Sequence, residues 1–226
     1  MEKKEPKRRN GYYYDLPGKE SGEGYPSVTT ILKVIAKPQL TFWIKRETAR
    51  EAIRTLDEAA AIAYTDNIMK KAGNEGTTAH KIIEEYWKGN KYEKDKIADK
   101  IKVYLDAFEE FLKSHTPKLI ETEGVCYSDK YQYAGTFDGL FEIGGLIWLI
   151  DWKTSNNIYK EHRIQLIAYK KALEEMGKKI DRVAIVQLKN NGLPLVEMVG
   201  EKEDEVDVFK AFIACKHLYD VLDKLK

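Results

Sequence analysis

The chain has 226 residues, 43% of them hydrophobic and 33% charged, and a formal net charge of only +1. This length allows one substantial core, and the small net charge excludes nucleic-acid binding through a global excess of Lys and Arg. No stretch approaches the roughly eighteen apolar residues of a membrane span, and charges stand where a signal peptide would be apolar. We therefore expect a soluble, intracellular protein of the cytoplasm.

The two cysteines exclude common metal-binding scaffolds. Cys126 and Cys215 lie far apart, and no further Cys or His completes a metal-binding clip around either of them. Neither a zinc ribbon nor a four-cysteine iron–sulfur cluster can be built from this pair, and a reducing compartment fits best.

The first 24 residues form a basic segment that we expect to be partly flexible. A solubilising tail and a DNA-contacting arm both fit this composition. The mixture of Tyr with Gly and Pro over residues 11–26 suggests an extended or hairpin-like stretch. Against two acidic residues, Glu2 and Glu5, the segment carries five basic ones: Lys3, Lys4, Lys7, Arg8 and Arg9.

Residues 25–226 are expected to form a single domain whose first part, about 27–115, is helical. Ser27 predicts the cap of a short helix. The run from residue 41 to about 72 lacks Pro and Gly and favours helix throughout, in one or two pieces. Apolar residues at three-to-four spacing predict a further helix over residues 93–114.

Two glycines, Gly73 and Gly76, predict a break between these helical runs. Thr77 or Thr78 then caps a new helix that ends near Gly89. That helix carries His80 and Glu84 one turn apart, so both side chains are expected on one face.

The second part of the domain, about 118–226, changes to short β-prone runs. A mixed central sheet flanked by helices follows from this order, an α/β (α+β) fold with the helices of 41–114 on one side. The predicted strands cover 118–127, 133–143, 146–152, 183–188 and 195–199, and the predicted helices cover 161–176 and 203–225.

Polar residues stand on two neighbouring predicted strands. Asp138 lies at the turn into one strand, and Asp151 and Lys153 end the next. If these strands pair, two carboxylates and an ammonium meet at one sheet edge, which suits a divalent cation and the hydrolysis of a phosphodiester. Taken alone, each motif fits a structural role as well as a catalytic one. Asp138 could be a turn residue, and Asp151 and Lys153 an ordinary surface ion pair.

The combination of motifs resembles the RecB-like branch of the PD-(D/E)XK nuclease superfamily. Residues 25–32, Tyr-Pro-Ser-Val-Thr-Thr-Ile-Leu, are also similar to the start of phage and mitochondrial genome-maintenance exonucleases of that branch. The resemblance implies a restriction-endonuclease-like fold. The residues that carry it are Gly76-Thr77-x-x-His80 with Glu84, Ala134-Gly135-Thr136-x-Asp138, Asp151-x-Lys153-Thr154-Ser155 and Gln165-x-x-x-Tyr169.

The resemblance also implies the roles of site residues. His80, Asp138 and Asp151, with the backbone carbonyl of Trp152, would bind Mg²⁺ or Mn²⁺. Three further residues are implied as catalytic or as supports of the site: Lys153, Gln165 and Tyr169.

Two acidic positions stay open in this comparison. Glu84 either orients His80 or is solvated. Glu123 is assigned to an acidic position of the family, although Glu121 fits almost as well.

Basic and aromatic residues on the first long helix could bind single-stranded DNA, because bases stack on rings while Lys and Arg follow the phosphates. The candidate residues are Trp43, Lys45, Arg46 and Arg50, although Trp43 fits core packing at least as well. The density of helix formers suggests an arch or cover over the cleft, which would favour threading of a free end.

The expected function is a Mg²⁺- or Mn²⁺-dependent deoxyribonuclease, an exonuclease acting on single-stranded ends. A structure-selective or nicking endonuclease and a non-cleaving DNA-binding scaffold are the alternatives. We expect the protein to be a monomer that binds DNA and does not bind a membrane. The family resemblance implies a role in DNA replication, recombination or repair, with replication or recombination proteins as possible partners. It also implies that a phage or virus could encode the protein.

Overall fold

The computed structural model describes residues 6–19, 23–200 and 205–225, and its centre is a five-stranded sheet of order β4-β5-β6-β7-β8. All neighbouring strands pair antiparallel except β6 and β7, which are parallel and joined by α5 (Lys160–Glu175). The predicted mixed sheet is therefore confirmed, with strand ends within two residues of expectation. The strands are β4 (Lys118–Ser128), β5 (Tyr133–Ile143), β6 (Leu146–Lys153), β7 (Arg182–Leu188) and β8 (Pro194–Met198).

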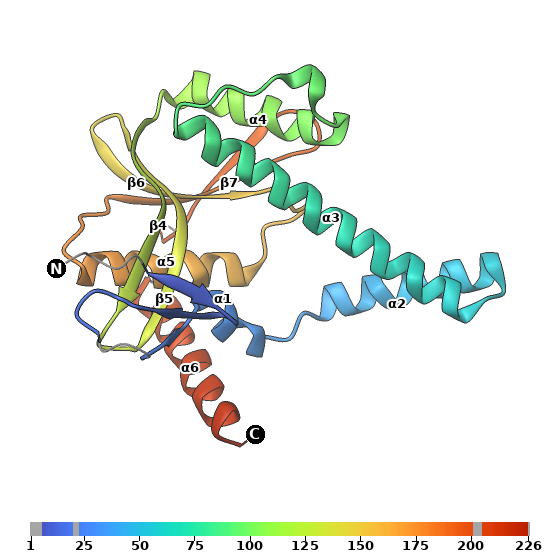
Figure 1. Ribbon diagram of the computed structural model, residues 1–226, viewed down its shortest axis with the longest axis horizontal. Helices are drawn as coiled ribbons and strands as arrows, with labels where there is room; N and C mark the ends of the chain where they lie inside the picture. Colours follow the sequence, from blue (N-terminus) through green and yellow to red (C-terminus); the bar gives the residue numbers. More distant parts are fainter. Residues whose placement is uncertain (1–5, 20–22, 201–204, 226) are drawn as a thin grey trace.

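Helices cover both faces of this sheet (Figure 1). On one face, α4 (Asp99–His115) and the C-terminal part of α3 (Glu58–Trp87) bury Phe108 and Ile83 against Trp152. The Phe108 and Trp152 rings meet edge to face with centroids 5.3 Å apart, a favourable aromatic geometry.

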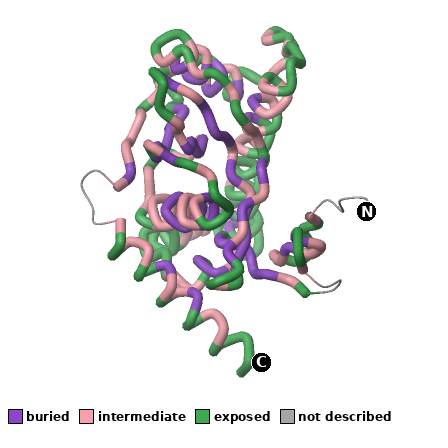
Figure 2. The backbone as a smooth tube through the Cα atoms, turned by 90° about the vertical axis from the view of Figure 1, so that its left-hand side faces the viewer, coloured by how far each residue is buried: buried purple, intermediate pink, exposed green. Residues whose placement is uncertain are grey.

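On the other face, α5 and α6 (Glu205–Lys224) pack with the short α1 (Val28–Ile31) around Leu173 and Phe212. Figure 2 shows the buried residues concentrated in these layers, whereas the last turns of α6 are exposed. Within the described ranges, each helix is too short or too polar to span a membrane.

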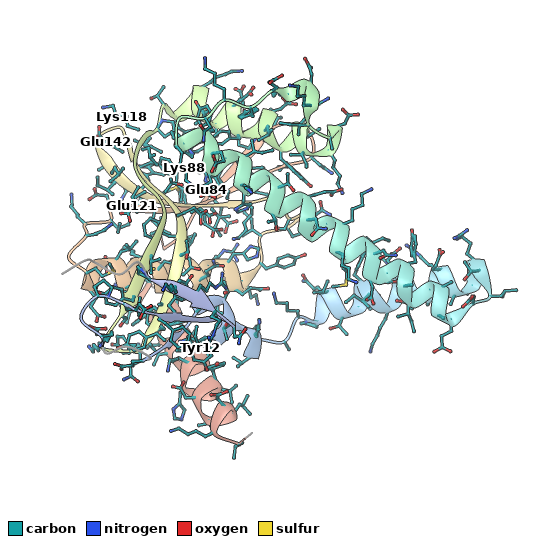
Figure 3. The ribbon with its side chains drawn as sticks, in the orientation of Figure 1. Tyr12, Glu84, Lys88, Lys118, Glu121 and Glu142 are labelled. Atoms are coloured by element: carbon teal, nitrogen blue, oxygen red, sulfur yellow. The ribbon has the colours of Figure 1, made fainter. Side chains whose placement is uncertain are left out.

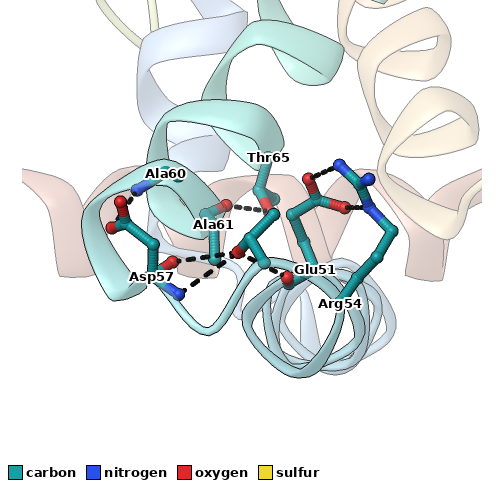
Figure 4. A network of polar contacts seen from close by, with 7 residues as sticks. Glu51, Arg54, Asp57, Ala60, Ala61 and Thr65 are labelled. Carbon is teal, nitrogen blue, oxygen red and sulfur yellow. Dashed lines mark hydrogen bonds and ion pairs between the residues drawn. The ribbon is translucent and has the colours of Figure 1, made fainter.

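One part of the helical prediction is wrong, because α2 (Pro38–Thr55) and the first half of α3 do not cover the sheet. They form a helical hairpin that projects from the body of the protein instead of arching over it (Figure 1). Polar contacts hold its turn (Figure 4): Asp57 caps α3 by accepting from the Ala60 amide at 3.0 Å, and Glu51 pairs with Arg54. Thr48 and Thr65 join the two helices through hydroxyls 3.0 Å apart.

The predicted break at Gly73 and Gly76 is also wrong, since α3 runs unbroken through both. The hydroxyls of Thr77 and Thr78 donate to carbonyls four residues earlier and cap nothing. Glycine inside a helix costs about 1 kcal/mol, which packing readily offsets. Gly76 has a packing reason, because a Cβ there would lie 2.8 Å from the Thr154 hydroxyl at the end of β6.

The helix predicted over residues 93–114 begins later, at Asp99. Residues Lys94–Lys96 form a separate 3₁₀ turn, η2, and another one, η1, covers Leu32–Val34 after α1. The short helix capped by Ser27 is confirmed, because the Ser27 side chain accepts from the Thr30 amide at 3.1 Å.

The N-terminal segment forms a second, three-stranded sheet of β1 (Lys7–Arg9), β2 (Tyr12–Tyr14) and β3 (Tyr25–Pro26). Tyr13 and Leu16 are only 2% exposed, so this sheet contributes to the core. The hairpin-like stretch expected over residues 11–26 thus begins earlier, inside the basic run. The candidate tail residues Lys3 and Lys4, with Glu2 and Glu5, lie outside the described residues.

Candidate active site

The β5–β6 ladder brings the two aspartates together. Its last pair is Gly139 with Ile150, and just beyond it the Asp138 carboxylate accepts from the Trp152 amide at 2.8 Å. Asp138 therefore lies within β5 and not at a turn, which corrects the position expected for it. Asp151 follows Ile150 directly, so the two carboxylates stand where the strands separate.

Asp151 and Lys153 point to the same side of β6, as strand alternation requires. Their charged atoms are 2.5 Å apart, and their side chains are 3% and 18% exposed. Burial raises the pKa of Asp151 and outweighs the opposing effect of Lys153. Burial lowers the pKa of Lys153, but the charges of Asp151 and Asp138 raise it by more. The net shift is upward, so Lys153 is cationic.

His80 reaches this site from α3. The close approach of Gly76 to Thr154 places the next helical turn over the strand ends, with His80 Nδ1 3.6 Å from Asp138 Oδ2. Glu84, one turn further along, forms an ion pair with Lys88 (Figure 3). The structure gives Glu84 a partner other than His80.

Glu123 and Glu121, the two candidates for the acidic position, differ in location. Glu121 pairs with Lys178 away from the cleft, whereas Glu123 faces Asp138 across the β4–β5 ladder. Glu123 adopts φ +50, a conformation that a non-glycine side chain rarely takes and that is common at functional sites. Although Glu123 is exposed to solvent, desolvation of its carboxyl and the nearby charges of Asp138 and Glu84 raise its pKa to about 7.

Two adjoining cavities form the cleft above these residues. One, of about 520 Å³, is lined by Asp138, Glu123 and Tyr169 among others. The second, of about 280 Å³, is lined by Lys153 and His162 among others. Three residues line both cavities, so they form one groove: Thr29, His80 and Gln165.

Gln165 and Tyr169 lie side by side on α5, where Gln165 Nε2 donates to the Tyr169 hydroxyl at 3.0 Å. The Tyr169 ring packs over Gly135, where a Cβ would come within 2.2 Å of it. Burial raises the pKa of Tyr169 well above its usual value, so its hydroxyl stays protonated and can donate to an oxygen in the cleft.

The basic residues proposed on α2 are not among those that line either cavity of the groove. Arg46 and Arg50 both contact Glu47, and Lys45 is exposed on the projecting hairpin. Trp43 is half-buried and belongs to none of the hydrophobic clusters of the described residues, so core packing does not describe it.

Several lining residues were not assigned to the active site from the sequence, although Arg8 was named in a segment that fitted a tail or a DNA-contacting arm. Arg8 and Tyr13 enter from the N-terminal hairpin, and Lys33 and His162 line the smaller cavity. Burial and the nearby charge of Lys153 lower the pKa of His162 to about 4, so it is neutral at pH 7. The Asn10-Gly11 pair was the sequence signal for the hairpin of β1 and β2 that carries Arg8 and Tyr13, because both Asn10 and Gly11 adopt positive φ in its tight turn.

The donor atoms fit a hard divalent cation. As arranged here, no three His, Cys, Asp or Glu side chains in the described part of the chain already form a metal-binding group. Asp151 Oδ2 is nonetheless buried without a hydrogen-bonding partner of suitable geometry, although the Lys153 ammonium lies beside it. Clustered carboxylates of this kind repel each other until a cation joins them.

Comparison with known proteins gives one informative match. The model of the family described as the PD-(D/E)XK nuclease superfamily matches residues 43–225, which is most of the chain. No curated protein matches significantly.

Proposed function

The chain belongs to the PD-(D/E)XK nuclease superfamily, and we propose that it is a Mg²⁺- or Mn²⁺-dependent deoxyribonuclease that degrades DNA from single-stranded ends. The observation that carries this proposal is the meeting of Asp138, Asp151 and Lys153 where β5 and β6 separate, beneath His80 of α3. The motif series around these residues favours the RecB-like branch.

In the proposed site, His80, Asp138 and Asp151 would hold the metal with the Trp152 carbonyl. The bound ion supplies an acidified water and offsets charge on the scissile phosphate. Asp151 Oδ2 is buried beside Lys153 without a hydrogen bond of suitable geometry, and no cysteine is among the described residues that line the groove. Both features suit an oxygen-preferring ion.

The remaining side chains act on the substrate directly. Lys153 places a positive charge in a poorly solvated position, where it stabilises the charge that builds up on an attacked phosphate. The Tyr169 hydroxyl, oriented by Gln165, donates to a phosphate or sugar oxygen. Glu123 can accept a proton near neutral pH, which suits transfer of a proton from the attacking water.

The shape of the groove supports a single strand as substrate. Its walls come from the N-terminal hairpin, α1 and α3, and the two cavities follow one another past His80. Lys45, Arg46 and Arg50 on the projecting hairpin would contact the strand outside the groove, with Trp43 available for stacking. Preference for free ends follows if the strand must thread between these walls.

The test is a time course with Mg²⁺, Mn²⁺ or EDTA on end-labelled linear single-stranded, linear duplex and circular single-stranded DNA. Metal-dependent loss of linear strands alone would support the exonuclease. Cutting of circles would replace it with the endonuclease, and metal-free binding without any cutting would favour the scaffold.

The matched variants are Asp151→Asn and Glu142→Gln. Glu142 lies at the far end of β5, paired with Lys118 (Figure 3). Its substitution by Gln therefore removes the same charge outside the groove. Asp151→Asn should reduce cleavage about 10³-fold, because several kcal/mol of transition-state stabilisation depend on the metal. Glu142→Gln should leave the rate unchanged, and full activity of Asp151→Asn would refute the assignment.

A further inference from the structure

The N-terminal hairpin is fixed to the sheet beside the proposed active site. The Tyr13 hydroxyl bonds to Thr136 Oγ1 at 2.7 Å, two residues before Asp138 on β5. The Ser27 amide donates to the Gly11 carbonyl at 2.7 Å, which ties the hairpin turn to the start of α1. This hairpin lies before the segment matched by the family model, yet it forms one wall of the groove.

Arg8 extends from this wall into the larger cavity. Its guanidinium carbon lies 5.7 Å from the centroid of the Tyr13 ring, and Nη2 donates to Thr29 Oγ1 at 3.3 Å. Arg9, its neighbour on β1, makes the same kind of ring contact with Tyr14, at 5.9 Å, but does not line the cavity. Strand alternation thus directs one of two adjacent arginines into the groove.

Arg8 shares its cavity with acidic side chains but is not paired with any of those that the structure describes. Glu123, Asp138 and Glu84 line the same cavity, but within the described ranges none of the acidic side chains lies at ion-pair distance from Arg8. Within the part of the chain that the structure describes, its side chain makes one hydrogen bond, to a neutral hydroxyl, and most of its five N–H donors have no partner there. A guanidinium held on a ring and a hydroxyl suits an anion with paired oxygens, and phosphate matches its fork.

Building on the proposed function, we infer that Arg8 binds a phosphate of the nucleic-acid strand next to the scissile one. Lys153 lines the smaller cavity and Arg8 the larger, and the two cavities share Thr29, His80 and Gln165 between them. The strand therefore runs along the groove from the Arg8 side past His80 to the Lys153 side. Arg8 fixes its register and does not take part in bond cleavage.

The test compares Arg8→Ala with Arg9→Ala, which removes the same charge one residue away. Steady-state cleavage gives kcat and KM, and anisotropy of labelled single strands gives Kd in the Asp151→Asn background. Arg8→Ala should raise KM and Kd about tenfold with kcat little changed, and should reduce the salt slope of binding by about one. Arg9→Ala should change each value less than about twofold.

Arg8→Lys separates recognition from structure, because it keeps the charge but loses the fork. Partial recovery of affinity, with melting temperatures equal among the variants, supports the inference. Equal losses in Arg8→Ala and Arg9→Ala would overturn it, as would a loss that Lys does not lessen while the melting temperature falls.

Substrates with and without terminal phosphates distinguish an internal phosphodiester from a strand end, and an Arg8-specific loss in either arm supports phosphate binding. If the wild type cleaves DNA but Arg8→Ala behaves like Arg9→Ala, only this inference fails. If the wild type neither cleaves nor binds any oligonucleotide, the proposed function fails and this inference with it.

Discussion

α4 and α2 have nearly the same length but opposite surroundings. The 17 residues of α4 bury Ile101, Tyr104, Leu105, Ala107, Phe108 and Phe111, whereas the 18 residues of α2 bury only Glu51. The first half of α3, which packs on α2, buries only Ala61 and Thr65. The body of the protein is thus held by apolar packing, and the projecting hairpin by small residues and polar contacts.

This difference separates stability from surface function. Buried apolar area is the main favourable term in folding, so the sheet and its helices dominate the free energy of unfolding. Segments with few buried apolar contacts open locally at low free-energy cost. The exposed side chains of the α2–α3 hairpin are therefore open to change without loss of the fold.

The largest expected effect tests this contrast with one residue type. Phe108 is fully buried among Tyr86, Trp87 and Trp152, whereas Phe42 on α2 is 67% exposed. Phe108→Ala should lower the free energy of unfolding by about 3–5 kcal/mol, and Phe42→Ala by less than about 0.5 kcal/mol. Urea denaturation measures both, and similar losses would contradict the division into body and projecting hairpin.

A smaller effect is expected at the two glycines of α3, which lie on either side of the boundary between these regions. Gly73 has open space around it, so Gly73→Ala should stabilise the protein by up to about 1 kcal/mol through helix propensity. At Gly76 the new Cβ would meet Thr154, so Gly76→Ala should gain less stability and lower cleavage about tenfold by displacing His80. Melting temperatures and initial rates of the pair check this, and equal rates would show that the approach at Gly76 does not position the site.

The smallest effect concerns Glu123. Its folded-state pKa of about 7 lies above that of an unfolded chain, so the folded state binds the extra proton and stability falls as pH rises from about 4.5 to 7. Glu123→Gln removes this loss and should be more stable than wild type above pH 7, by less than about 1 kcal/mol because solvent screens the site. Thermal melts in EDTA at pH 4.5 and 8 measure it, and an equal difference at both pH values would exclude titration of Glu123 as the cause.

Local sequence pattern correctly predicted most of the sheet and the helices packed on it. Alternation and turn residues placed all five strands of the main sheet, and the polar residues Asp151 and Lys153 follow buried Leu149 and Ile150 at the end of β6, as expected. These signals are strong because burial on both faces restricts which residues are tolerated.

The errors occurred where long-range packing overrode local preference. In the sequence Gly76 resembles a helix end. In the structure it lies inside α3, where the Thr154 hydroxyl, 78 residues further along the chain, leaves too little space for a side chain. Sequence spacing could not separate Glu121 from Glu123, because the positive φ at Glu123 is set by the pairing of β4 with β5. Arg8 was named only as one of several basic residues in a segment that fitted a solubilising tail or a DNA-contacting arm, since nothing nearby in the sequence shows that Tyr13 anchors its strand at Thr136.

The unbroken course of α3 has a mechanical consequence. Thirty residues at 1.5 Å each make a rod about 45 Å long, with the tip of the hairpin at one end and His80 near the other. Neither glycine bends it, so no hinge separates the two. A strand or protein bound at the tip is therefore connected to His80 through one continuous helix.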